Sequence, residues 1–243
     1  MDIITAQDFR LVSCQATLFT PDEEVSSAKL VRELLPKWAD RFDADPTILP
    51  ASAGIPPEIP RLILQSTSQT WRCQIASARI DLFWLKSVAD PSNIPLDAFF
   101  REAIQRLNEY GEFLGARVGR MAAVLNRYAE HPAPGLFLTR HFCQDRWLTG
   151  PLAQLENCEL HTHRRLSLAE RFQVNFWVRS KTGTLSSGQE SSPVVVVEQD
   201  LNTLLEDMET QAFTSGDIEK FFLATVTQFD ESLQLYYPRE DQL

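Results

Sequence analysis

A Cys-Glu-Leu-His-Thr-His run holds the residue types that ligate transition metals. Thiolate and imidazole groups are the ligands that zinc prefers, and this run supplies Cys158, His161 and His163. In an extended strand the two histidines share a face and Cys158 points the other way. The other candidates, His141 and Cys143, fall at the end of an expected helix, and the paired spacing of a zinc site is absent. We therefore interpret the histidines as polar residues of a strand face and predict no metal and no other cofactor.

The sequence also lacks the common patterns of a catalytic site. It has no GxSxG, HExxH, Walker or GxGxxG motif, and 9 glycines leave little material for a phosphate-binding loop. The Ser-rich segment Gly183–Ser192 has no neighbouring base and is typical of a flexible loop. Glu198 and Asp200 follow the run Val194–Val197, where they either mark the exit of the strand into solvent or bind a cation. We predict no catalytic residue.

A strand with two different faces is predicted over Arg171–Lys181, because apolar and polar residues alternate there. The polar face holds Arg171, Gln173, Asn175, Trp177, Arg179 and Lys181. Arg and Lys pair with carboxylates or phosphates, and Trp stacks on flat or cationic groups. We expect His161, His163 and Arg165 to extend this face from a neighbouring strand. The candidate partner-binding residues are therefore Arg165, Arg171, Asn175, Trp177, Arg179 and Lys181; the alternatives are a solvated sheet face, or one covered by the acidic C-terminal region.

Charge is unevenly distributed along the 243 residues, whose formal net charge is -10. Residues 1–114 carry a net charge of -5, residues 115–181 carry +5, and residues 182–243 carry -10. Such asymmetry predicts either a polar surface for a partner or two parts of the fold that attract each other. The overall negative charge argues against tight non-specific binding of nucleic acid, which depends on neutralising phosphates.

Hydrophobic periodicity predicts alternating strands and helices in the first half of the chain. A strand over Phe9–Phe19 precedes a helix that opens at Pro21-Asp22-Glu23-Glu24 and runs to Phe42. A Pro-rich connection over 43–60 leads into three strands with short gaps, which indicate an antiparallel meander. These strands are Arg61–Ser66, Thr70–Ala76 and Ala78–Lys86. A turn at Asp90–Asn93 and an amphipathic helix over Leu96–Leu114 complete this half.

The same order of elements is expected in the second half. A strand over Ala116–Tyr128 and a short helix over Pro134–Phe142 precede three strands, Leu155–Leu168, Arg171–Lys181 and Pro193–Gln199. Thr214-Ser215-Gly216-Asp217 then caps a final helix. The pattern predicts an α+β fold of antiparallel sheet and packed helices, built from two halves of similar element order, residues 1–114 and 115–243. The halves form either two lobes or one continuous domain, with the strands joined in one curved sheet.

Two segments resemble a sporadically distributed bacterial family of uncharacterised proteins of similar length. They are residues 56–82, with Pro56-Pro57-Glu58-Ile59-Pro60-Arg61, Trp71-Arg72 and Arg79-Ile80-Asp81-Leu82, and residues 117–126, with Arg117-Val118-Gly119-Arg120 and Asn126. Met121-Ala122-Ala123 departs from the aromatic pattern of the family. This family has no assigned activity, so the resemblance carries over no catalytic role. The patchy distribution of the family implies mobile or defence-associated genes. From the residues themselves, Gly119 indicates either a β-bulge or a close backbone approach, and Arg117 and Arg120 are expected to bind carboxylates of the acidic C-terminal region.

The leading hypothesis is therefore a non-catalytic cytoplasmic protein that binds a partner, within a bacterial defence or toxin-neutralising module. It lacks a run of about 20 apolar residues and the layout of a signal peptide, so neither a membrane nor secretion is expected. Cys14, Cys73, Cys143 and Cys158 are interpreted as buried thiols. One alternative is a small-molecule binder or enzyme with a cavity lined by Phe99, Phe100, Phe221 and Phe222; another is a nucleic-acid binder. Homo-oligomers are compatible with the sequence.

Overall fold

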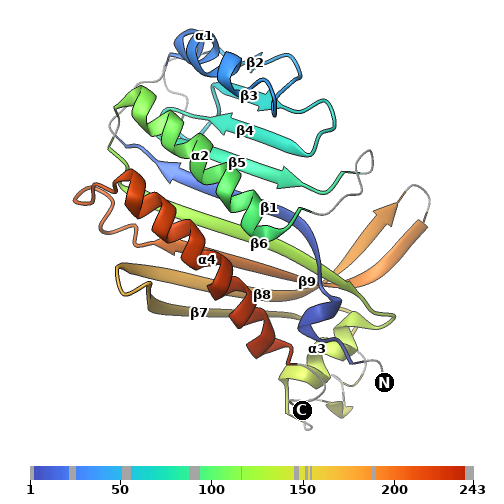
Figure 1. The fold of residues 1–243 in the computed structure, drawn as a ribbon. Coiled ribbons are helices and arrows are strands. Elements are labelled where there is room, and N and C mark those ends of the chain that lie inside the picture. The colour runs from blue at the N-terminus through green and yellow to red at the C-terminus, as the bar shows by residue number, and fades with distance from the viewer. Residues whose placement is uncertain are drawn as a thin grey trace.

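Nine strands of the described chain form one antiparallel sheet with helices packed against it (Figure 1). The computed structural model describes residues 3–21, 26–50, 56–87, 94–115, 117–144, 148–150, 153, 155–187 and 190–238. The elements are η1 (Ala6–Asp8), β1 (Arg10–Phe19), α1 (Ser27–Trp38), β2 (Thr47–Ile48), β3 (Leu62–Gln65), β4 (Trp71–Ile75), β5 (Arg79–Leu85), α2 (Leu96–Leu114), β6 (Arg120–Glu130), α3 (Pro134–Phe142), β7 (Glu159–Leu168), β8 (Phe172–Ser187), β9 (Glu190–Thr203) and α4 (Ser215–Tyr236). The predicted α+β class is confirmed.

The two halves of the sequence share a single sheet, with strand order β2-β3-β4-β5-β1-β6-β9-β8-β7. The antiparallel pairing of β1 with β6 joins them at the middle of the sheet, where Ala16 faces Ala123. The predicted meander is present, since β3 pairs with β4 and β4 with β5. The first half contains two elements more than its expected order, the short 3₁₀ helix η1 and the two-residue strand β2, which pairs with β3.

Helices with clear amphipathic stripes have the predicted bounds. Leu96–Leu114 and Pro134–Phe142 are helical over their whole predicted lengths. The last helix starts after Thr214, whose side chain accepts from the Asp217 N–H while the Asp217 carboxylate accepts from the Thr214 N–H. This capping box satisfies two N–H groups that would otherwise lack partners.

The first helix is shorter than predicted. It spans Ser27–Trp38, is capped by Ser26, and ends before Phe42, which is nevertheless buried. The predicted acidic start at Asp22, Glu23 and Glu24 lies outside the described residues, as does the predicted turn at Asp90–Asn93.

The strands of the second half differ from their predicted bounds. The expected loop over Gly183–Ser192 is wrong: β8 and β9 continue as a hairpin through Gly183↔Val194 to Ser187↔Glu190. A two-stranded ladder pairs the inward-facing backbone groups of both strands and leaves the outward-facing ones to solvent, so polar residues such as Ser and Thr fit there. The strand predicted from Ala116 instead begins at Arg120, and the strand predicted from Leu155 begins at Glu159.

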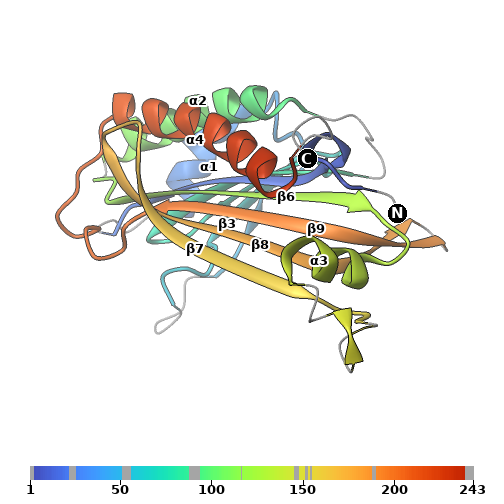
Figure 2. The same cartoon turned by 90° about the horizontal axis from the view of Figure 1, so that it is seen from below.

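Helices α2 and α4 lie together on one side of the sheet (Figure 2). The alternation in β8 explains this, because Phe172, Val174, Phe176 and Val178 are buried on the helix side. The four phenylalanines proposed to line a cavity are fully buried: Phe99 packs on Phe100 with ring centroids 5.0 Å apart, Phe100 on Phe222 at 5.6 Å, and Phe222 on Phe221 at 5.1 Å. The rings fill the space between the helices instead of enclosing a cavity.

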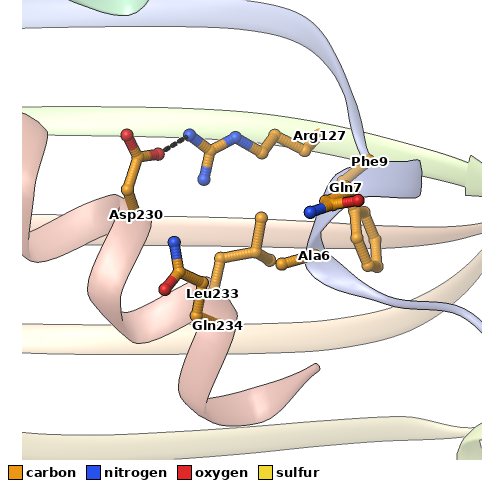
Figure 3. A pocket seen from close by; sticks show the side chains of 7 residues that line it. All are labelled: Ala6, Gln7, Phe9, Arg127, Asp230, Leu233 and Gln234. Atoms are coloured by element: carbon orange, nitrogen blue, oxygen red, sulfur yellow. Dashed lines mark hydrogen bonds and ion pairs between the residues drawn. The ribbon is translucent and has the colours of Figure 1, made fainter. Parts of the chain in front are cut away.

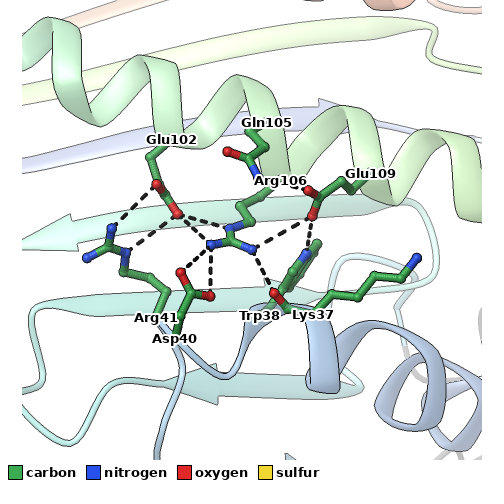
Figure 4. A network of polar contacts seen from close by, with 8 residues as sticks. All are labelled: Lys37, Trp38, Asp40, Arg41, Glu102, Gln105, Arg106 and Glu109. Carbon is green, nitrogen blue, oxygen red and sulfur yellow. Dashed lines mark hydrogen bonds and ion pairs between the residues drawn. The ribbon is translucent and has the colours of Figure 1, made fainter.

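A network around Arg106 joins α1 to α2 (Figure 4). The side chain of Arg106 is 6% exposed. Its Nε donates to Glu102 Oε1 at 2.9 Å, its Nη1 to the carbonyl oxygen of Lys37 at 3.1 Å, and its Nη2 to both carboxylate oxygens of Asp40. Glu109 of α2 accepts from the indole N–H of Trp38 at 2.6 Å, which adds a second connection between α1 and α2. All three nitrogens of the guanidinium group therefore have partners.

The four cysteines are free thiols, as predicted, but only two are buried. Burial raises the pKa of the Cys14 and Cys73 thiols well above the ordinary range. Cys143 and Cys158 are half-buried, which corrects the expectation that all four lie in the core. None of the helices in the described part of the chain is both long and apolar enough to span a membrane.

Candidate partner-binding face

The predicted face is the side of strands β7, β8 and β9 that lies opposite α4, because Phe172 and Phe176 on the other side of β8 pack on that helix. Antiparallel register places its residues in rows, because directly opposed side chains share a face. One row is His163, Trp177 and Asp200; the next is Arg165, Asn175 and Asn202; the third is His161, Arg179 and Glu198. These are all exposed or half-buried except Asn202, which is 7% exposed. The strand pairing thus brings the predicted residues of β7 and β8 together and adds two carboxylates of β9.

Trp177 lies at the centre of this face and is held by two neighbours. Its ring stacks on His163 with centroids 4.2 Å apart and an interplanar angle of 20°. The Arg179 guanidinium carbon lies 5.3 Å from the ring centroid, within the range of a cation–π contact. The His163 Nε2 also lies 3.1 Å from Asn175 Oδ1, which fixes the plane of the imidazole. The Trp177 ring is therefore held in one orientation by contacts within the chain.

The cations of the face are paired within the chain. Arg179 bonds to Glu198 and lies 3.8 Å from Asp200 Oδ2, and Lys181 Nζ lies 3.9 Å from Glu198 Oε2. Arg165 pairs with Glu206 at 2.7 Å, beyond the end of β9. Glu198 and Asp200 lie inside β9, so the prediction that they mark the exit of that strand is wrong.

Arg171 lies at the edge of the predicted face and reaches towards α4. Its Nε is 3.1 Å from Asp217 Oδ1, so it contacts the capping box of that helix. Burial by itself would raise the pKa of Asp217, but the N–H of Thr214 and the Arg171 guanidinium hold this pKa below its ordinary value. The structure thus separates Arg171 from the rows around Trp177 and gives it a role at the start of α4.

Attraction between the basic and acidic parts of the sequence explains the uneven charge. Arginines of residues 115–181 pair with carboxylates of residues 182–243 in Arg117–Glu209, Arg127–Asp230, Arg165–Glu206, Arg171–Asp217 and Arg179–Glu198. Of the two predicted explanations, attraction within the fold is therefore realised. The face that results carries both signs of charge.

The predicted carboxylate contact with the C-terminal region is confirmed for Arg117 but not for Arg120. Arg117 Nη1 donates to the backbone carbonyls of Met208 and Gln211, at 2.8 and 2.9 Å, and its carboxylate contact is to Glu209 at 3.6 Å. Arg120 donates to the Asn202 side chain and to the Thr203 carbonyl, so the prediction of a carboxylate partner is wrong for it. Burial lowers the pKa of Arg120, and the nearby Asp200 and Glu206 oppose this.

Gly119 has the predicted close approach. A Cβ atom at this position would collide with the carbonyl oxygen of Met208, so a larger residue would push the segment after β9 away. The same segment supplies both carbonyls that bind Arg117.

The metal-ligating residue types do not converge within the described residues. His161 bonds to Glu159 Oε1 at 2.7 Å and His163 stacks on Trp177. His141 lies elsewhere, with Nε2 2.7 Å from the carbonyl oxygen of Tyr236. No group of three or more Cys, His, Asp or Glu side chains in the described part of the chain has the geometry of a metal site.

Two pockets lie apart from the Trp177 rows. The larger, of about 240 Å³, lies between residues 6–9 and the end of α4, with Arg127 of β6 at its base (Figure 3). The smaller, of about 100 Å³, is lined in part by Arg171, Gln173 and Asp207. Arg127 was not predicted from the sequence as a functional residue. Its only signal was a cation among the buried positions of a strand, where an unpaired charge is costly.

No family model matches this chain, and no curated protein matches it. Among solved structures, it is similar to the crystal structure of the di-domain ARO/CYC StfQ from the steffimycin biosynthetic pathway. The two share 9% sequence identity over 95% of this chain and 99% of that chain, with a TM-score of 0.21. A likeness at this TM-score carries no conclusion about fold or function.

Proposed function

We propose that this chain is a non-catalytic bacterial interaction protein that binds a protein partner through the face around Trp177. The observation that supports this is the row of His163, Trp177 and Asp200, in which a half-buried tryptophan is oriented on the sheet face opposite α4. Tryptophan and arginine are enriched among residues that dominate binding energy. Side chains already held in one geometry lose less entropy on binding.

The charges of the face favour a protein over a nucleic acid. A surface that binds phosphates needs uncompensated cations, and here Arg165, Arg179 and Lys181 already have carboxylate neighbours. A protein surface of mixed charge can match both signs and exclude partners of the wrong pattern. The resemblance to a sporadically distributed bacterial family supports a cytoplasmic role in a defence or toxin-neutralising module.

The test is capture of the tagged protein, expressed with its native genomic neighbours, followed by identification of any stoichiometric partner. Trp177→Ala combined with Arg179→Ala should weaken binding of that purified partner by about 2 kcal/mol or more, since both lie at the centre of the face. The matched control also removes one cation and one large apolar side chain, Arg32→Ala with Leu235→Ala, at sites that are 74% and 72% exposed.

Circular dichroism and urea unfolding must show that both double variants remain folded. Equal capture of the partner by the wild type and the Trp177/Arg179 variant would refute the proposed face. Tight binding of duplex DNA that falls steeply with salt and depends on Arg179 would favour a nucleic-acid binder instead.

A further inference from the structure

The pocket above Arg127 combines a buried cation with an accessible carboxylate. The Arg127 side chain is 9% exposed, and its Nη2 donates to Asp230 Oδ1 at 2.5 Å (Figure 3). Asp230 is 51% exposed, so its carboxylate is still reached by solvent. Both signs of charge are therefore present at one end of the pocket.

The buried side-chain amide of Gln199 sets the orientation of the Arg127 guanidinium group. Gln199 is fully buried, accepts from Arg127 Nη1 at 2.9 Å, and donates through Nε2 to the carbonyl oxygen of Phe229 at 2.7 Å. Within the described residues, the hydrogen bonds of Arg127 use Nη1 once and Nη2 once. A guanidinium group has five N–H donors, so this arginine has capacity for a further acceptor.

The remaining walls are apolar or neutral. Phe9 and Leu233 supply apolar surface, and Gln7 and Gln234 supply amides at the rim. The wall formed by residues 6–9 is tied to the end of α4, because Ala6 N–H donates to the carbonyl oxygen of Tyr237 and the Phe9 ring packs on Tyr237 at 4.7 Å. This connection keeps the two sides of the pocket together.

Charge balance selects the class of ligand. A simple carboxylate would bind Arg127 beside the negative charge of Asp230 and be repelled by it, whereas a simple amine would meet the guanidinium group. A zwitterion with adjacent carboxylate and ammonium groups matches both side chains and leaves no buried charge unpaired. At roughly 30 Å³ for each water-sized group, the volume of about 240 Å³ holds on the order of eight such groups.

We propose that this pocket binds a free α-amino acid with an aliphatic side chain of the size of valine or leucine. The carboxylate accepts from Arg127, the ammonium group donates to Asp230, and the side chain packs on Phe9 and Leu233. This site is independent of the proposed partner face, because Arg127 lies on the helix side of β6 and Trp177 on the opposite side of the sheet.

The test is calorimetric titration of the full chain with L-leucine and L-valine and with two analogues that each carry one charge, 4-methylpentanoate and 3-methylbutylamine. The wild type should bind at least one of the amino acids, and both analogues should bind at least about tenfold more weakly than it. Asp230→Asn should weaken binding of the amino acid by about tenfold or more and should leave binding of 4-methylpentanoate equal or tighter. Glu231→Gln is the matched control, because this exposed neighbour on α4 does not line the pocket and should change neither.

Three results would overturn the proposal: no heat from either amino acid at about 10 mM, 4-methylpentanoate binding as tightly as L-leucine, or unchanged affinity in Asp230→Asn. Ala6→Phe provides a second variant that keeps both charges and fills the pocket. It should abolish binding while the free energy of unfolding stays close to that of the wild type; retained binding in this variant would place the ligand elsewhere.

Discussion

Arg106 and Arg127 are both buried, yet their surroundings differ. Arg106 lies between two helices, and Glu102, Asp40 and the Lys37 carbonyl occupy all three of its guanidinium nitrogens. Arg127 joins a strand to α4 with one amide and one half-exposed carboxylate, and it borders a pocket. A buried guanidinium group with all its nitrogens bonded acts as a structural tie. A buried guanidinium group that has unused N–H donors and borders a pocket can bind a ligand in that pocket.

The largest expected effect comes from removing the enclosed arginine. Arg106→Leu should lower the free energy of unfolding by about 3–5 kcal/mol, because it removes the cation beside Glu109 and leaves Glu102 paired only with the more distant Arg41, at 3.4 Å. Urea unfolding followed by circular dichroism measures this loss. Arg101→Leu, whose side chain is 71% exposed, is the control and should stay within about 0.5 kcal/mol of the wild type. A loss below about 1 kcal/mol for Arg106→Leu would mean that the network contributes little.

Removing the pocket arginine should cost less. Arg127→Met is expected to lower the free energy of unfolding by about 2 kcal/mol, because Gln199 loses a donor while Asp230, being 51% exposed, rehydrates. The same urea titration compares the two arginines directly. If both variants lost the same free energy, Arg127 would be a structural tie of the same kind as Arg106.

Two carboxylates of α4 also pair with arginines of the sheet region. Asp217 lies at the start of the helix and bonds to Arg171, and Asp230 lies near its end and bonds to Arg127. Asp217→Asn should cost about 1 kcal/mol near neutral pH, because the carboxylate serves the capping box and Arg171. The pKa of Asp217 is depressed in the folded state, so this stabilisation is present above the unfolded pKa of about 4 and is lost as the pH falls through the folded value. The deficit of the variant should therefore shrink in acid.

Urea unfolding near pH 7 and near pH 3 tests the dependence on pH. Glu219→Gln, at an exposed site on the same helix, provides the control and should show no comparable difference. A deficit for Asp217→Asn that persists unchanged in acid would show that its charge does not contribute.

The smallest effect is expected for the pocket carboxylate. Asp230→Asn should change the free energy of unfolding by only about 0.5 kcal/mol, because the amide oxygen still accepts from Arg127 and the site is half-exposed. The measurement is the same urea titration without added amino acid. A loss as large as that of Arg127→Met would indicate that the pair mainly fastens α4 to the sheet.

Some features of the candidate site were predictable because they depend on residues close in sequence. The alternation over Arg171–Lys181 placed Trp177 and Arg179 on the side of the strand opposite Phe176, as observed. The carboxylates opposite them, Glu198 and Asp200, were visible as residues, but their alignment depends on the register between β8 and β9. Register is a property of two strands, so a single strand pattern does not contain it.

The two arginine sites were harder to find. Arg106 lies on the buried stripe of α2 between Ala103 and Tyr110, but periodicity alone does not show that α1 brings Asp40 to it. Arg127 meets Asp230 across 103 residues of sequence. Long aliphatic stems allow arginine to occupy buried positions when partners come from elsewhere in the fold.

The sequence by itself determined the α+β class, the bounds of α2 and α3, the cap of α4 and the two faces of β8. These follow from local propensity, side-chain periodicity and hydrogen bonds that span a few residues. Only the tertiary structure decided that both halves share one sheet, that the acidic C-terminal region neutralises the basic strands, and that Arg127 borders a pocket. The physical reason is that strand order, ion pairing and cavities arise from contacts between segments far apart in the chain. A local sequence pattern does not show which distant segments will come into contact.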